Sequence, residues 1–250
     1  MLIMVSFAAE PIVRLGFFTV TNSFLDTLLV DFFLIGLIVV LNKKIKLIPG
    51  FLQNFLEMII QIFYELTESV AGKNAPKIFP YFMTFFIFIL VANWTGLIPG
   101  LTSIGFYENH KLTPILRAAT SDFNVTLALA LVSAVATHVM SISTIGIKSY
   151  LSRYISLNPI YLFVGFLEVI SEITKVISLS FRLFGNIFAG EIVLGTVSTI
   201  FAFLFPLPFL MLEVIVGLIQ ALVFAMLTMA FMAILTTPHH IHDEAKEVSH

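Results

Sequence analysis

Three long segments of this sequence lack any Asp, Glu, Lys or Arg, and they constrain the fold more than any other feature. They cover residues 78–107, 123–147 and 214–238. A membrane-spanning helix needs about 20 largely apolar residues. Lipid offers the backbone no hydrogen-bond partner, so only helices and closed barrels cross a bilayer. Barrel strands alternate over about 10 residues, unlike these continuous runs. The sequence therefore predicts an all-α, polytopic membrane protein.

The composition supports this fold class and excludes several functions. Apolar residues form 59% of the chain and charged residues 11%, whereas soluble domains carry about 25% charged residues. A formal net charge of −2 leaves no basic excess for a phosphate backbone, so we expect no nucleic-acid partner. The absence of cysteine excludes disulfides, thiolate metal sites and thiol nucleophiles. No basic segment precedes the apolar N-terminal residues, so we expect no cleaved signal peptide.

Proline and glycine positions divide the chain into membrane elements within a single domain, residues 1–250. After the first span, apolar and polar residues separate onto two faces, which favours an amphipathic helix on the membrane surface. About five membrane-embedded helices and one interfacial helix are expected. These are a first span at 24–45, an interfacial helix at 50–72, spans at 78–98 and 123–147, a long charged helix at 160–205, a last span at 209–237 and a polar tail at 238–250. Asp26 and Asp31 place the first half of the first span near an aqueous surface.

Lysine and arginine residues near span ends set the orientation of a membrane protein. In a five-crossing arrangement, eight of them fall on one side and three on the other. We therefore expect the N-terminus outside and the C-terminus in the cytoplasm, and a sixth crossing at 50–70 would mix the two groups. The eight are Lys43, Lys44, Lys46, Lys73, Lys77, Lys148, Arg153 and Lys246, and the three are Arg14, Lys111 and Arg117.

The segment 160–205 is long enough to cross a membrane, yet it carries five charged residues. At about 100° per residue, six of its polar residues fall on one stripe about 120° wide. Each charge at the centre of a span costs roughly 2.5–3.5 kcal/mol on insertion scales, so the stripe is expected to face protein or water. The stripe consists of Glu168, Glu172, Lys175, Ser178, Arg182 and Asn186, and Glu191 lies off it.

Arg182 is the residue of this stripe that most strongly indicates a function. Glu168, Glu172 and Lys175 have a structural alternative, in which they reach one membrane interface and Glu172 pairs with Lys175. Arg182 lies deeper and has no acidic residue within four positions. It therefore needs a carboxylate that its own helix does not supply. The small residues Gly185 and Ala189, four apart, allow another helix to approach closely beside it.

Other polar residues permit a structural and a functional interpretation. Glu213 and Gln220 share one face of the last span and form a second polar strip with Glu191, although a solvated carboxylate and a packing glutamine explain them equally well. His138 is either a hydrogen-bonded packing residue or a proton carrier. Asp122 begins a span with Asn124 close behind it, where helix capping alone accounts for the aspartate. The histidines of the tail, which we interpret as a solvated terminus and not as a metal site, are His239, His240 and His242.

Several segments resemble the signature segments of subunit a of F-type ATP synthases. These are SLSFRLFGNIFAGE (178–191), TSDFNVTLALAL (120–131) and LIQALVF (218–224), and IPGFLQNFLE and VANWTGLIPG are similar too. The resemblance extends over nearly the whole sequence from the first span onward. It implies the stator half of an ion path with two offset half-channels, and two long C-terminal helices tilted against a rotating ring of c subunits. The implied partners are the c ring, peripheral-stalk b subunits, other ATP synthase subunits and the lipid bilayer.

The resemblance also implies roles for individual residues. Arg182 matches the essential arginine that faces the ring carboxylates. The implied proton path comprises Gln220 and Asn186 beside the arginine, Glu191 and Glu213 in one half-channel, Glu168 in the cytoplasmic half-channel, and Asp122 and Asn124 near the outer start of a span. No cofactor or metal is expected, and the chain lacks the phosphate-binding motif of nucleotide-hydrolysing enzymes. An energy-transducing membrane, most simply the bacterial plasma membrane, is the expected location.

Two other functions remain compatible with the residues themselves. A secondary transporter or channel would house its own ion site, usually with repeated halves and broken helices. A purely structural membrane anchor would leave the cost of five charges in one helix without a purpose.

Overall fold

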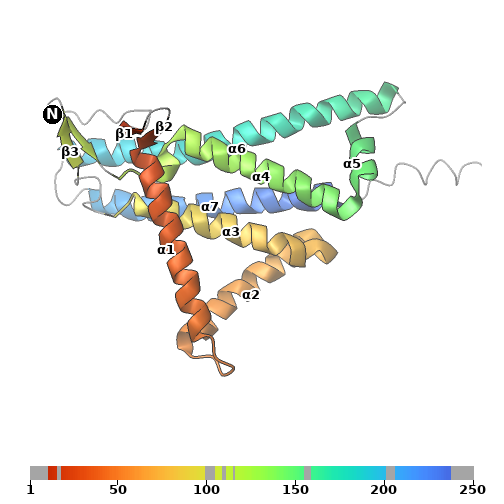
Figure 1. Cartoon of the computed structure of the whole chain (residues 1–250), viewed down its shortest axis with the longest axis horizontal. Helices are drawn as coiled ribbons and strands as arrows, with labels where there is room; N and C mark the ends of the chain where they lie inside the picture. Colours follow the sequence, from red (N-terminus) through yellow and green to blue (C-terminus); the bar gives the residue numbers. More distant parts are fainter. Residues whose placement is uncertain are drawn as a thin grey trace, which may run out of the picture.

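A computed structural model describes residues 11–15, 18–98, 105–108, 111–114, 116–154, 159–200 and 206–237 (Figure 1). The α-helices are α1 Asn22–Lys44, α2 Phe51–Ala71, α3 Ala75–Thr95, α4 Phe123–Ile145, α5 Ile147–Tyr154, α6 Pro159–Ile200 and α7 Pro206–Thr236. Two short 3-10 helices are η1 Gly72–Asn74 and η3 Ala119–Ser121. The predicted polar tail with His239, His240 and His242 lies outside the described residues, as do positions 201–205 of the predicted long helix.

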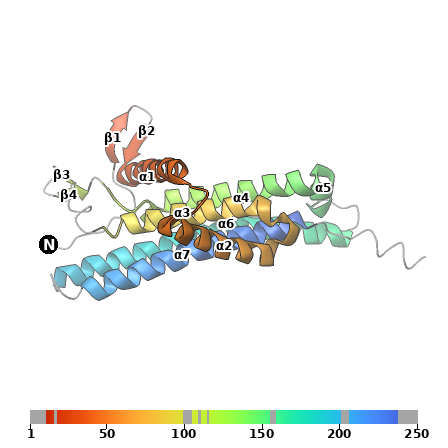
Figure 2. The same ribbon diagram turned by 90° about the horizontal axis from the view of Figure 1, so that it is seen from below.

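Four of the helices, α3, α4, α6 and α7, run along the long axis of the molecule (Figure 1). Helix α7 packs against α3, α4 and α6, so it occupies the centre of the bundle. Helix α1 crosses the direction of these four, and α2 leads back from its far end to α3 (Figure 1). Figure 2 shows α6 and α7 running side by side, which their contacts confirm. Bulky apolar side chains fill the interior, among them Phe82, Leu183, Phe224, Met229 and Met232.

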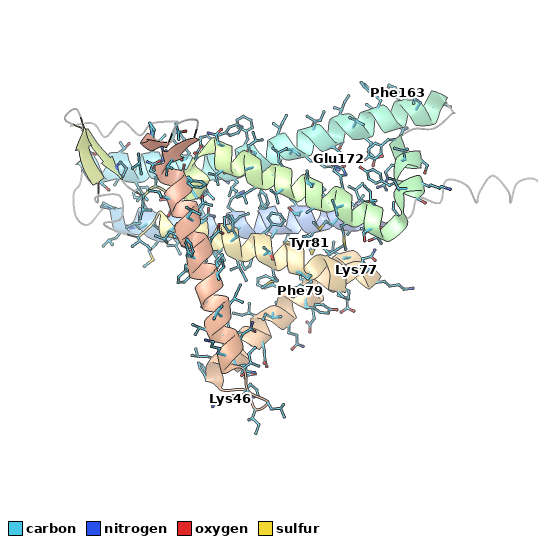
Figure 3. All side chains as sticks on the ribbon, in the orientation of Figure 1. Lys46, Lys77, Phe79, Tyr81, Phe163 and Glu172 are labelled. Carbon is cyan, nitrogen blue, oxygen red and sulfur yellow. The ribbon has the colours of Figure 1, made fainter. Side chains whose placement is uncertain are left out.

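The surface of the bundle is strongly apolar. Phe32 on α1 is 73% exposed and Phe163 on α6 is 62% exposed, and Figure 3 displays the side chains along the helices. Water-soluble monomers rarely expose continuous apolar surface of this kind. Four helical segments are long and apolar enough to cross a membrane, namely Asn22–Lys43, Phe51–Thr95, Phe123–Ile145 and Pro206–Thr236. The chain is an all-α, polytopic membrane protein.

Two small features of the fold were not predicted. Antiparallel hairpins form in the connections, from strands β1 Pro11–Leu15 and β2 Phe18–Thr21 and from β3 Gly105–Glu108 and β4 Lys111–Pro114. Strands of four or five residues are too short to give a clear alternating pattern. Helix α5 begins directly after Gly146, whose φ of +80° ends α4. A positive φ is readily adopted only by glycine, so this residue separates the two helices.

Asp26 lies in the interior and not at the aqueous surface that its position in the first span predicted. Its side chain is 2% exposed. The carboxylate accepts hydrogen bonds from the Thr95 hydroxyl at 3.1 Å and from the Ala119 amide at 2.9 Å. It therefore ties α1 to α3 and η3, and these bonds compensate for its burial.

Helix α6 passes very close to the end of α5 at Gly165. A Cβ atom at this position would overlap the backbone carbonyl of Tyr154. We therefore expect Gly165→Ala to destabilise the protein by about 1–3 kcal/mol, because the backbone carbonyl cannot move aside as a flexible side chain would. The measurement is the thermal unfolding midpoint of the detergent-purified protein. Gly36→Ala in α1 is the matched control, since a Cβ there meets nothing within 4 Å. Equal midpoints for the two variants would contradict the expectation.

Candidate functional site

Helix α6 carries five charged side chains, and four of them are paired within this chain. Glu168 pairs with Arg153 at 3.3 Å, Glu172 with Lys175 at 2.7 Å, and Glu191 with Arg117 at 3.2 Å. Arg182 is the exception, because it has no ion pair or hydrogen bond among the described residues. Its guanidinium cannot lose its charge in a protein. The stripe predicted from the sequence is thus divided into paired charges and one unpaired cation.

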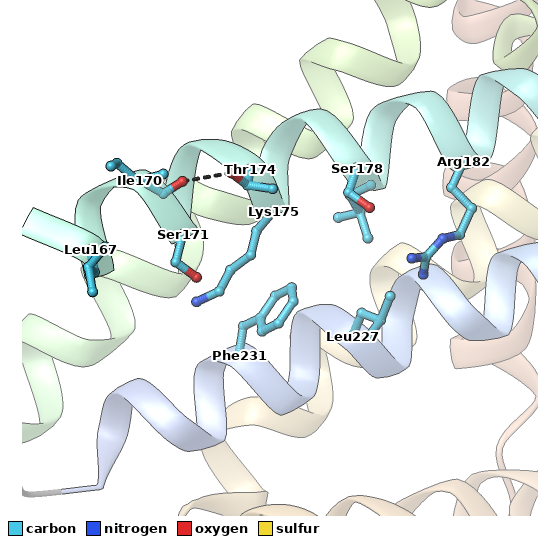
Figure 4. A pocket seen from close by; sticks show the side chains of 10 residues that line it. Leu167, Ile170, Ser171, Thr174, Lys175, Ser178, Arg182, Leu227 and Phe231 are labelled. Atoms are coloured by element: carbon cyan, nitrogen blue, oxygen red, sulfur yellow. Dashed lines mark hydrogen bonds between the residues drawn. The ribbon is translucent and has the colours of Figure 1, made fainter. Parts of the chain in front are cut away.

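Arg182 is exposed and lies at one end of a cavity of about 410 Å³ between α6 and α7. Figure 4 shows its side chain pointing from α6 towards α7, with Lys175 two turns away along the same helix. The Lys175 ammonium lies 4.7 Å from the centre of the Phe231 ring. Between the two cations the cavity is lined by the hydroxyl side chains of Ser171, Thr174 and Ser178.

The surface next to Arg182 is open on the side of the small residues. A Cβ atom at Gly185 would meet nothing within 4 Å, and Ala189 is exposed. The face of α6 that carries the unpaired cation is therefore not covered by another helix of this chain in the described structure. It has the low relief that close helix packing in membranes requires.

Asn186 and Gln220 join α6 to α7 one turn after the arginine. The Asn186 amide donates a hydrogen bond of 2.6 Å to the Gln220 side-chain oxygen. Gln220 is 4% exposed, whereas Asn186 is exposed. The structure thus brings together two of the predicted residues, and their bond fixes the spacing of the two helices beside Arg182.

Glu191 and Glu213 lie at one end of the bundle and differ in their surroundings. Glu191 is held by Arg117, a residue that is 6% exposed and also donates from its Nε to the Ser121 hydroxyl at 3.0 Å. Glu213 is 6% exposed, and its Oε2 has no hydrogen-bond partner in the described structure. The absence of a side chain at Gly190 makes room for this carboxyl, since a Cβ there would overlap Glu213 Oε1.

Asp122 caps the start of α4 and also holds the start of α1. Its Oδ1 accepts hydrogen bonds from the backbone and side-chain amides of Asn124, and its Oδ2 accepts from the Ser23 hydroxyl at 2.7 Å. The capping interpretation therefore accounts for the aspartate. Asn124 is exposed beside it.

The other end of the bundle holds a second group of titratable side chains on α4, α5 and α6. Glu168 meets Arg153 here, and Glu172 lies 3.9 Å from His138 Nε2. His138 Nδ1 and the Tyr150 hydroxyl share a hydrogen bond of 3.0 Å. Burial raises the pKa of the neighbouring Tyr154 above its ordinary value, and Tyr150 and the two glutamates contribute, so Tyr154 stays neutral at physiological pH.

Two contacts of this site were missed because the sequence analysis assigned both arginines to loops. Arg117 lies 74 residues before its partner Glu191, and Arg153 lies on α5, a helix the sequence did not predict. Both side chains are almost fully buried, at 6% and 5% exposure. Buried arginines are rare unless they are paired, but no spacing rule identifies the partner of a residue on another element. Neither arginine is an exposed loop charge of the kind that the orientation rule counts.

Comparison with known proteins identifies the family. The family model described as ATP synthase A chain matches residues 24–233. ATP synthase subunit a of Moorella thermoacetica is 32% identical over 222 residues, which cover 89% of this chain and 94% of that protein. The chloroplastic ATP synthase subunit a of Stigeoclonium helveticum is 34% identical over 220 residues, 86% of each chain. The chain is therefore a member of the ATP synthase subunit a family, as its signature segments had indicated.

Proposed function

We propose that Arg182 faces the membrane carboxylates of a rotating ring of c subunits, and that two half-channels on either side of it conduct protons. As a member of its family, the chain is the proton-channel component of the membrane sector of ATP synthase and works with other subunits of that complex. The arginine and the half-channels are the finer parts of the proposal.

The unpaired state of Arg182 is the observation that supports the proposal most. Every other charged side chain of α6 has a partner within the chain. An ionised group within a membrane is costly unless it is paired or reaches water. The open surface at Gly185 leaves room for a helix of another subunit, whose carboxylate would supply the missing partner.

The chemistry of arginine suits this position. A guanidinium attracts an ionised carboxylate but does not release a proton to it. A ring carboxyl would lose its proton into one half-channel, pass Arg182 as an anion, and take up a proton from the other half-channel. A neutral carboxyl can face lipid, whereas the anion cannot. The membrane potential contributes about 2.3 kcal/mol per charge per 100 mV, and ion flow thereby becomes rotation.

The polar groups at the two ends of the bundle are the candidate half-channels. Glu191 and Glu172 are 19 residues apart on α6, which corresponds to about 28 Å along a helix. Arg182 lies between them. We assign Glu213, Glu191, Asp122 and Asn124 to the outer half-channel, and Glu168 and its neighbours to the inner one.

The lengths of the last two helices favour a strong tilt against the ring. Helix α6 has 42 residues, so at about 1.5 Å per residue it is about 63 Å long. This is about twice the ~30 Å hydrocarbon core. If α1 stands across the membrane, the crossing arrangement in Figure 1 places α6 and α7 closer to the membrane plane. We further propose a surface position for α2, an outer N-terminus, a bacterial plasma membrane and b subunits as neighbours.

Arg182→Ala is expected to abolish ATP-driven proton pumping in inverted membrane vesicles while the complex still assembles, because the ring carboxylate loses its counter-ion. Pumping is measured by quenching of a pH-sensitive dye, and assembly by the subunit content of the purified complex. Lys148→Ala, which removes an exposed cation of α5, is the matched control and should pump normally. Retained pumping in Arg182→Ala would refute the proposal. Proton flux through the purified chain alone would instead favour a transporter or channel.

Arg182→Lys is expected to keep the charge but to leak. A desolvated lysine can release its proton, whereas an arginine cannot, so the barrier between the half-channels weakens. The measurement is the proton flux through the reconstituted complex under an imposed membrane potential without nucleotide. A leak no larger than that of the unaltered complex would contradict this role.

Glu213→Gln and Glu191→Gln are expected to fail in different ways. Glu213 has an unpartnered carboxyl oxygen, so its amide variant should assemble and conduct poorly. Glu191→Gln leaves the buried Arg117 without its carboxylate, which costs about 3–5 kcal/mol and should lower the amount of assembled complex. Assembly should recover in the double variant Arg117→Gln/Glu191→Gln. Identical behaviour of the two single variants would contradict this division of roles.

A further inference from the structure

The cluster of His138, Tyr150, Glu172 and Lys175 is not used by the mechanism above. It joins α4, α5 and α6 at the inner end of the bundle, and Figure 3 marks Glu172 within it. Both ring nitrogens of His138 face a polar group, with Tyr150 at Nδ1 and Glu172 at Nε2. An imidazole between two such groups can accept a proton at one nitrogen and release one at the other.

The polar groups continue from this cluster towards Arg182. Glu172 and Lys175 line a small cavity of about 20 Å³ together with Ser133 and Thr137. A cavity needs roughly 10–15 Å³ of this kind of volume to hold one water molecule. Lys175 also borders the larger cavity, whose hydroxyl-lined wall leads to Arg182. Groups able to carry a proton therefore extend from the α4–α5 turn to the arginine.

Glu168 lacks this connection. Its carboxylate is held by Arg153, whose Nη2 also reaches the Ile234 carbonyl at 3.5 Å. An arginine partner is permanently charged and keeps the carboxylate ionised. Glu172 instead has partners that can both change protonation, a histidine and a lysine. The geometry separates a structural carboxylate from one that can exchange its proton.

We propose that Glu172 exchanges protons with the inner aqueous phase, and that His138 and Tyr150 connect it to solvent. The inference rests on the proposed function and names the residues of its inner half-channel. His138 gives its Nε2 proton to the Glu172 carboxylate and receives one at Nδ1 from solvent through the Tyr150 hydroxyl. The 3.9 Å between Nε2 and Oε2 is longer than a hydrogen bond, so a bridging water or a small ring rotation completes the transfer.

The groups that face His138 are few. Tyr150 on α5 and Glu172 on α6 contact it, and Lys175 is bonded to Glu172. The Tyr154 ring lies 5.2 Å from the Tyr150 ring. Helix α7 contributes the Phe231 ring and has a single charged residue, Glu213, towards its other end. The pH response of the route should therefore follow the histidine and the glutamate.

Inverted vesicles containing the whole complex provide the test, because their cytoplasmic face is outside and the buffer sets the pH at the inner half-channel. We expect His138→Ala to lower ATP-driven pumping about tenfold, below the 10²–10⁴-fold typical of a full acid–base role because water replaces part of the route. The dependence of its rate on buffer pH between about 5 and 8 should flatten. Added imidazole should restore the rate, which a purely structural role would not allow. Lys148→Ala, with added imidazole, is the control and should not respond.

Glu172→Gln should lower pumping more than His138→Ala and should not respond to imidazole. Glu168→Gln should lower the amount of assembled complex but keep the shape of the pH profile. If His138→Ala pumps normally, or keeps its pH profile and ignores imidazole, the inference is wrong. If His138→Ala fails to assemble, an unchanged pH profile in Glu172→Gln overturns it. Normal pumping by Arg182→Ala in the same vesicles would instead overturn the proposed function.

Discussion

A permanently charged guanidinium without a counter-ion in its own chain is the constraint on which the arrangement depends. Arg182 lies on the open face of a long apolar helix, while the remaining charges of that helix are paired. Paired charges are tolerated in low dielectric because each compensates the other. An unpaired one is tolerated only if a partner or water reaches it. The structure of this subunit is thus electrostatically incomplete by itself, which agrees with its membership of a multisubunit complex.

Polar contacts between helices hold this charge in place. Ser133 and Thr228 share a hydrogen bond of 2.8 Å between α4 and α7, and Ser141 donates to the Leu235 carbonyl at 2.7 Å. The bond between Asn186 and Gln220 links α6 to α7. Apolar side chains pack equally well against lipid and against each other, so they do not by themselves select one helix arrangement. Hydrogen bonds of this kind define the register of α6 on α7, and with it the direction of Arg182.

The sequence predicted the helices well because continuous apolar segments leave no alternative in lipid, and it predicted the need of Arg182 for an external partner because no acid lies within four positions. It did not predict the pairing of Glu191 with Arg117, which depends on how a loop folds back over 74 residues. The break at Gly146 was missed for a related reason, since a single glycine does not reveal its positive φ. Local periodicity determines the elements, whereas contacts between elements need the three-dimensional structure.

The position of Arg182 between the two polar groups explains why a fixed chain of this design cannot conduct protons alone. On the proposed assignment, a proton that enters at Glu213 has to pass the guanidinium before it reaches Glu172. The guanidinium neither accepts nor releases protons, and its charge repels a hydronium ion that approaches through water. The path within the chain is therefore interrupted at its middle. A carboxyl group that moves past the arginine on another subunit bypasses this interruption, and its movement is the coupling of ion flow to rotation.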